Sequence, residues 1–145
     1  MDRLQRVFSL SGRVSRLGFW RFQVRQALAL AAAWCLTIFA TMLGGRLGLL
    51  PSLLLPAIWV AGAMVCARRL HDRGRSAWWA IAFLAGPYLL LAVANLMLQG
   101  NRDPVTALAT LPLSLGAVAL AVWGWIEIGF RRGTRGANTF GPEPR

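Results

Sequence analysis

Four long apolar stretches, separated by short arginine-rich segments, constrain the fold of this chain more than any other feature of its sequence. They cover about residues 26–43, 47–67, 77–98 and 105–128. A helix needs roughly 20 apolar residues to cross the core of a bilayer. Soluble helices show a polar face, and these stretches have almost none. The sequence therefore predicts an all-α integral membrane protein, a single membrane domain over residues 1–145 whose four transmembrane helices form a bundle.

The first apolar stretch is interpreted as a retained span and not as a cleaved signal peptide. Its basic leader extends as far as Arg25, and the stretch ends in the letters MLGG without a small-residue cleavage site directly after it. Trp34 and Trp59 lie deep within the first two stretches. We expect both rings to pack between helices.

The distribution of arginine predicts the orientation of the four spans. All 16 basic residues are Arg, and 14 of them fall in residues 1–25, 68–76 and 131–145; the other two are Arg46 and Arg102. By the positive-inside rule, these three segments are cytoplasmic, so both termini lie inside the cell. The net charge of +11 is confined to short blocks between apolar stretches. That segregation is typical of a membrane protein and argues against binding of nucleic acid.

The sequence offers no set of residues that would hold a metal or a cofactor. Cys35 and Cys66 both lie inside apolar stretches, and His71 is the only histidine. These residues do not have the spacing of a metal motif. We interpret the two cysteines as small residues in helix packing.

Three polar segments of defined pattern are predicted to meet on the cytoplasmic side. They are an N-terminal segment (GRVSRLGFW), a loop (RRLHDRGRSAWW) and a C-terminal tail (GTRGANTFGPEP). We expect Ser15 and Ser76 to cap the helices that follow them, Asp72 to pair with a neighbouring Arg, and Glu127 to pair with Arg131 four residues later. The tail glycines permit positive φ, and the tail is expected to pack against the loop that contains His71.

Together, these three motifs resemble the bacterial inner-membrane family known as domain of unknown function 805 (the YhaH-like proteins). The resemblance extends from about Phe8 to Pro144, with the motifs in the family's order. It departs from the family pattern at Ala77, where Gly is usual, and at Gly18, where an acidic residue is common. The resemblance implies an inner-membrane location and the topology above. It implies no reaction, because the family has no established activity.

The cytoplasmic motifs support several hypotheses about function. The first is a non-enzymatic protein whose Arg-rich face contacts anionic phospholipid headgroups, a second copy or another membrane protein. The motifs could also act only as locks on the bundle. A small oligomeric transporter or channel subunit, or a lipid-headgroup enzyme that uses His71 as a base, are further alternatives. The predicted headgroup-binding residues are Arg13, Arg16, Arg68, Arg69, His71, Asp72, Arg73, Arg75, Ser76 and Asn138.

Overall fold

The computed structural model describes residues 10–43, 46–100 and 103–144. Within these ranges the regular structure is helical, and an isolated bridge between Asn138 and Gly141 is the only β-type pairing. Four helices are long and apolar enough to cross a membrane. The prediction of an all-helical fold with four helices of membrane-spanning length is therefore confirmed.

The first hairpin consists of α2 (Arg16–Met42) and α3 (Leu54–Asp72), joined through the 3₁₀ helix η1 (Arg46–Leu53). Ser15 caps α2 as predicted, since its hydroxyl accepts a hydrogen bond from the amide of Gly18 at 3.2 Å. The prediction that residues 68–72 belong to a loop is wrong, because α3 continues through them to Asp72. Arg69 and His71 lie in its last turn, where positive charge is favourable at the carboxyl end of the helix dipole.

The second hairpin consists of α4 (Trp78–Gly100) and α5 (Pro104–Trp125), and a π-helical turn, η2 (Ile126–Phe130), continues from α5. Pro87 lies inside α4 without ending it. Asp103, which the sequence did not single out, caps α5 through a 2.6 Å bond from the amide of Thr106. Ser76 contributes to the start of α4 through its carbonyl, which accepts from the amide of Trp79.

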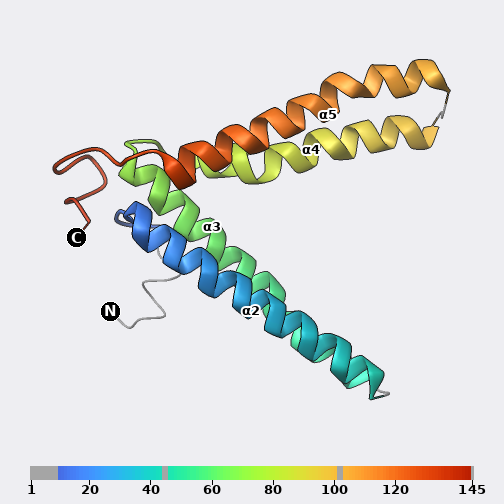
Figure 1. Ribbon diagram of the computed structural model, residues 1–145, viewed down its shortest axis with the longest axis horizontal. Helices are drawn as coiled ribbons and strands as arrows, with labels where there is room; N and C mark the ends of the chain where they lie inside the picture. Colours follow the sequence, from blue (N-terminus) through green and yellow to red (C-terminus); the bar gives the residue numbers. More distant parts are fainter. Residues whose placement is uncertain (1–9, 44–45, 101–102, 145) are drawn as a thin grey trace.

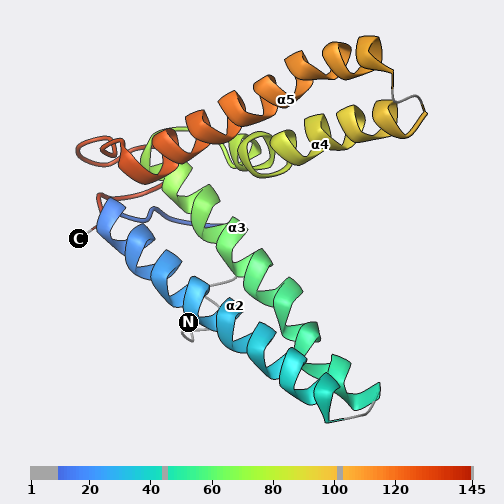
Figure 2. The ribbon, with the colours of Figure 1, turned by 45° about the vertical axis from the view of Figure 1, so that its right-hand side comes forward.

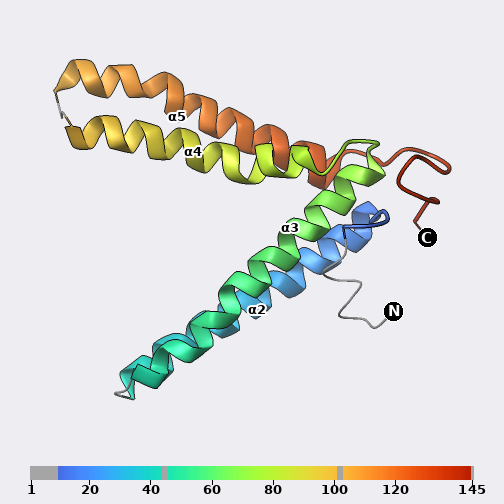
Figure 3. The same ribbon diagram turned by 180° about the vertical axis from the view of Figure 1, so that it is seen from behind.

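The two hairpins diverge from one shared corner and do not form the predicted four-helix bundle (Figures 1, 2 and 3). We call this corner the polar end, because residues 10–15, the loop of residues 73–77 and the tail of residues 131–144 all lie there. The buried core is concentrated beside it and includes Phe19, Val65, Leu70, Phe83 and Ile128. Apolar length predicts a span but does not determine which helix faces pack together, so the sequence could not exclude this open arrangement.

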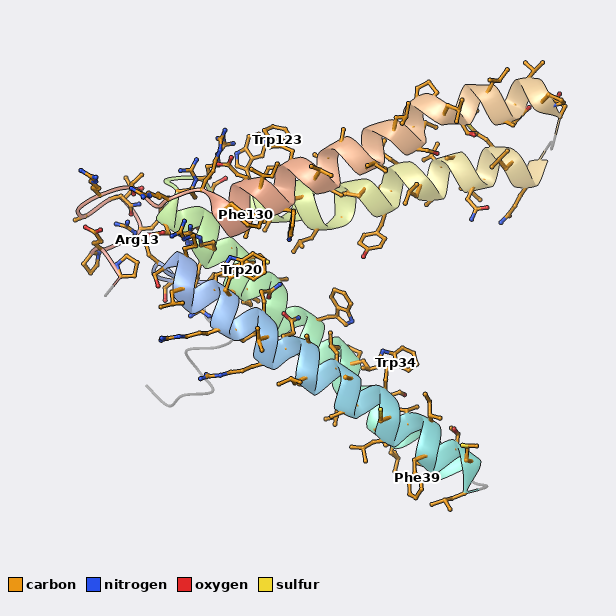
Figure 4. The ribbon with its side chains drawn as sticks, in the orientation of Figure 1. Arg13, Trp20, Trp34, Phe39, Trp123 and Phe130 are labelled. Atoms are coloured by element: carbon orange, nitrogen blue, oxygen red, sulfur yellow. The ribbon has the colours of Figure 1, made fainter. Side chains whose placement is uncertain are left out.

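Away from the polar end, each hairpin buries only a narrow stripe of small residues. Ala33 and Thr37 are buried on α2, and Ala94, Thr110 and Ala117 are buried in the second hairpin. The expectation that Trp34 and Trp59 pack between helices is wrong, because Trp34 is 56% exposed and Trp59 is 57% exposed. Trp34 and Phe39 project outward from α2 (Figure 4). Such apolar surfaces are compatible with contact to lipid chains.

Candidate functional site

The three polar segments meet at the polar end, as predicted, and two buried carboxylates hold them together. Asp72 ends α3 and is 3% exposed, and Glu127 lies in η2 and is fully buried. Each carboxylate is surrounded by arginines from different parts of the chain. We call these groups the Asp72 cluster (Asp72, Arg13 and Arg69) and the Glu127 cluster (Glu127, Arg73, Arg75 and Arg131).

In the Asp72 cluster, two arginines bind opposite oxygens of one carboxylate. Arg13 donates from Nε at 3.0 Å and from Nη2 at 2.8 Å to Oδ1 of Asp72, and Arg69 pairs with Oδ2. The side chains of Arg13 and Arg69 are 1% and 0% exposed. Buried charges of this kind are retained only when they are paired and hydrogen-bonded. The predicted pairing of Asp72 with a neighbouring Arg is confirmed.

Arg69 also joins α3 to the end of the second hairpin. Its Nε donates to the carbonyl of Ile128 at 3.0 Å, and its Nη2 donates to the carbonyl of Arg131. Trp20 of α2 reaches the same turn and donates from Nε1 to the carbonyl of Gly129 at 2.9 Å. These donors satisfy carbonyls that a helix leaves without partners at its carboxyl end.

The Glu127 cluster uses three arginines around one carboxylate. Arg73 and Arg75 contact Oε1 at 2.9 and 3.1 Å, and Arg131 contacts Oε2 at 2.9 Å. The predicted Glu127–Arg131 pair is therefore confirmed. Arg73 and Arg75 were expected to face an external anion, whereas the structure places both against a carboxylate of the protein itself. Arg75 also lies over the ring of Trp79, 4.7 Å from its centre.

The C-terminal tail is folded against the segment that contains His71, as predicted, although this segment is the last turn of α3 and not a loop. Asn138 donates from Nδ2 to the carbonyl of His71 at 2.9 Å, and the ring of Phe140 stacks on His71 with centroids 4.1 Å apart. Thr134 donates from its amide to the carbonyl of Asp72 at 2.8 Å. Arg13 donates to three tail carbonyls, those of Thr134, Gly136 and Gly141.

The tail glycines serve two different purposes. Gly136 and Gly141 have φ of 74° and 129°, as the sequence predicted. Gly133 was also expected to adopt positive φ, but it is not among the described residues that do so. A Cβ at Gly133 would instead collide with the carboxylate of Asp72. This glycine therefore permits the close approach of the tail to the Asp72 cluster.

A pocket of about 420 Å³ opens beside the Asp72 cluster. Exposed arginines Arg16, Arg132 and Arg135 line it, together with the hydroxyl-bearing residues Ser15 and Thr134. We call it the Arg pocket. Arg16 makes one long bond of 3.4 Å to the carbonyl of Phe130. The remaining residues that line the Arg pocket are Leu17, Arg69, Asp72, Gly133, Glu143 and Pro144.

The structure thus divides the predicted headgroup-binding residues into several groups. The internal network of the polar end contains Arg13, Arg69, His71, Asp72, Arg73, Arg75 and Asn138. Arg16 lies in the wall of the Arg pocket. Arg68 is partly buried and accepts a bond at its carbonyl from the amide of Val14, and Ser76 is exposed at the start of α4.

Sequence reasoning missed Arg132 and Arg135 as site residues, and it did not predict that Glu127 would gather three arginines. A signal for Arg132 was present in the adjacent arginines at positions 131 and 132, directly after the fourth apolar stretch. His71 and Asp72 are adjacent, but their side chains face different partners. Among the residues that the structure describes, no group of three or more His, Cys, Asp or Glu could hold a metal ion.

Comparisons with known proteins agree with the sequence motifs. Residues 7–142 match the family described as "Protein of unknown function (DUF805)". The chain is 30% identical to "Uncharacterized protein YiiR" of Escherichia coli (strain K12), over 96% of this chain and 88% of that relative. YiiR of Escherichia coli O157:H7 matches with the same figures. No solved structure matches the chain.

Proposed function

The chain belongs to the DUF805 family, and because neither the family description nor its relatives' names give an activity, we propose a function from the geometry of the polar end. The chain is a non-enzymatic protein of the bacterial plasma membrane that binds the headgroup of an anionic phospholipid in the Arg pocket. Both of its termini face the cytoplasm. Its binding residues are Arg16, Arg132 and Arg135, and the two carboxylate clusters keep these arginines in place.

The orientation is supported by the positions of the arginines. Residues 1–25, 68–76 and 131–145 hold 14 of the 16 arginines, and their described portions gather at the polar end. Of the other two, Arg46 begins η1, and Arg102 falls between the third and fourth apolar stretches of the sequence. Segments rich in arginine remain on the cytoplasmic side of bacterial membranes, which favours a cytoplasmic polar end.

The observation that carries the proposal is the difference between two sets of arginines. Five arginines are paired with Asp72 or Glu127. Among the described contacts, Arg16, Arg132 and Arg135 have no such ion pair, and all three are exposed around one cavity. A guanidinium group binds a phosphate through two parallel hydrogen bonds. Unpaired guanidinium groups around a cavity at a membrane surface are suited to a lipid phosphate.

Glu143 also lines the Arg pocket, and its carboxylate accepts a 2.8 Å bond from the amide of Gly136. This bond holds the Glu143 carboxylate against the backbone of the tail, and the amide offsets part of its negative charge. His71 supports the non-enzymatic assignment, since its ring is stacked on Phe140 and its residue is 7% exposed. A base that acts on a lipid headgroup would need access to it.

The test is native mass spectrometry of the purified protein after exchange into phosphatidylglycerol or phosphatidylcholine. The double variant Arg132→Gln/Arg135→Gln is compared with Arg21→Gln/Arg25→Gln, which removes the same charge from exposed positions of α2 outside the pocket. An arginine near an anionic surface contributes about 1 kcal/mol. We therefore expect phosphatidylglycerol to bind the pocket variant roughly 30-fold more weakly.

The α2 control variant removes the same charge near the headgroups but no lining residue of the Arg pocket. We expect it to weaken phosphatidylglycerol binding clearly less than the pocket variant does. Equal losses in both double variants would show that the lipid responds to net charge and not to the pocket, and that result would contradict the proposal. Retention of phosphatidylcholine as strongly as phosphatidylglycerol would also contradict it.

A further inference from the structure

An apolar cleft lies between the two hairpins, next to the polar end. It consists of two adjoining cavities of about 400 and 370 Å³, which share Gln23, Cys66, Leu84 and Tyr88. Residues from all four long helices contribute to its walls. Cys66 precedes Arg69 by about one turn of α3, so the cleft lies directly beneath the Asp72 cluster.

Aromatic and aliphatic side chains form most of this cleft, and one buried polar atom among them lacks a hydrogen-bond partner. Phe19, Phe83 and Trp125 line the larger cavity. Gln23 Oε1 is buried and has no hydrogen-bond partner among the described residues. Gln26, which lines the smaller cavity, differs because its Nε2 donates to the carbonyl of Ile58 at 3.1 Å. A buried carbonyl in apolar surroundings requires a donor.

The position of Gln23 along α2 indicates the depth at which that donor would lie. Exposed Arg21 and Arg25 flank Gln23 on the same helix. Arginines at the ends of membrane spans extend their charged groups toward the headgroups. Gln23 is therefore close to the boundary between headgroups and acyl chains. Hydroxyl and ester groups of glycerolipids lie at this boundary.

The dimensions of the cleft favour a flexible chain over a helix from another protein. A helix is about 10 Å across and rises 5.4 Å per turn, so each cavity would hold on the order of one turn. Both cavities fall within the roughly 300–1,000 Å³ range of sites for small lipophilic ligands. Among the residues that the structure describes, no arginine lines either cavity, so the site offers no guanidinium group to a phosphate.

We propose that this cleft binds a neutral glycerolipid with a free hydroxyl group, of the diacylglycerol class. The Gln23 side chain rotates so that its Oε1 faces the cleft and accepts a hydrogen bond from the lipid hydroxyl, and an acyl chain lies along the apolar walls toward Trp125. This site is separate from the Arg pocket and takes a ligand of different chemistry. It does not depend on the function proposed above.

The first experiment measures photocrosslinking with a diacylglycerol that carries a diazirine in one acyl chain. The probe is added to the full-length protein in detergent, and the labelled peptides are identified by mass spectrometry. We expect labels on α2 near Gln23 and on α5 near Trp125, with competition by unlabelled diacylglycerol. Phosphatidylcholine with the same chains has no free hydroxyl and should compete about three- to tenfold less well.

Three variants test the role of the amide and of the cavity. Gln23→Leu removes the acceptor, and Ala121→Phe places a ring into the larger cavity, which Ala121 lines. We expect both to reduce labelling by about three- to tenfold. Asn95→Leu is the matched control, because it removes an exposed amide from α4 outside the cleft. It should label as the parent does.

Thermal unfolding in detergent provides an independent measurement that does not require crosslinking. Gln23→Leu should be at least as stable as the parent without lipid, because it removes a buried group that lacks a partner. Diacylglycerol should raise the Tm of the parent and of Asn95→Leu but not that of Gln23→Leu. Equal competition by phosphatidylcholine, or unchanged labelling of Gln23→Leu, would overturn the proposal.

Discussion

The polar end and the outer parts of the two hairpins are held together by different kinds of interaction. At the polar end, side chains and carbonyls far apart in the sequence are matched atom to atom, as when Arg13 binds Asp72 and three tail carbonyls. Toward the other ends of the hairpins, small residues pack in a stripe and large apolar side chains remain exposed, such as Met42 at 81%. The arrangement of the hairpins is therefore set at one end. Substitutions at the two places should have very different effects.

The largest expected effect comes from Asp72→Asn. This change leaves Arg13 and Arg69 buried without a compensating charge, and breaking a buried ion pair typically costs about 3–5 kcal/mol. We expect a large loss of thermal stability in detergent, with release of the tail to limited proteolysis. Glu143→Gln is the control, because it neutralises an exposed carboxylate of the tail. A stability loss no greater than that of the control would show that the Asp72 cluster does not hold the polar end together.

A smaller loss is expected from Glu127→Gln. The three arginines of the Glu127 cluster are 20%, 30% and 54% exposed at their side chains, so water can solvate them when the carboxylate is neutralised. We expect a destabilisation of about 1–3 kcal/mol, below that of Asp72→Asn. The two variants are compared by their unfolding midpoints under identical detergent and salt. The reverse order would contradict the assignment of Asp72 as the more important carboxylate.

The smallest effect is expected in the outer parts of the hairpins. Leu96→Ala and Leu108→Ala each shorten a side chain that is exposed, at 67% and 65%. Exposed substitutions usually change stability by less than about 0.5 kcal/mol, and unfolding in detergent should barely change. Leu70→Ala is the matched comparison at the polar end, where the same truncation of a fully buried leucine should cost about 2–5 kcal/mol. A large loss from Leu96→Ala or Leu108→Ala would show that these surfaces are covered by protein.

Sequence reasoning succeeded where the physical cause was local. Apolar length predicted four helices, Ser15 was placed as a cap from its position before the first helix, and Glu127 and Arg131 were paired from their spacing of four. The bond between Arg13 and Asp72 joins residues 59 positions apart, and no local pattern specifies it. The need for glycine at position 133 is also tertiary, because it arises from the approach of Asp72. The divergence of the hairpins depends on which helix faces pack, and uniformly apolar helices do not encode this in a periodic pattern.

The contacts of Arg13 also have a consequence for biosynthesis. This residue is made early, yet it binds carbonyls 121 to 128 positions later in the chain. Translation proceeds from the N-terminus, so these bonds can form only after the last apolar segment has been inserted. They also require both segments to be on the same side of the bilayer. A molecule that inserted an odd number of its helices would leave Arg13 and the tail on opposite sides of the bilayer. Neither segment would then bind the other, and both would be open to quality-control proteases.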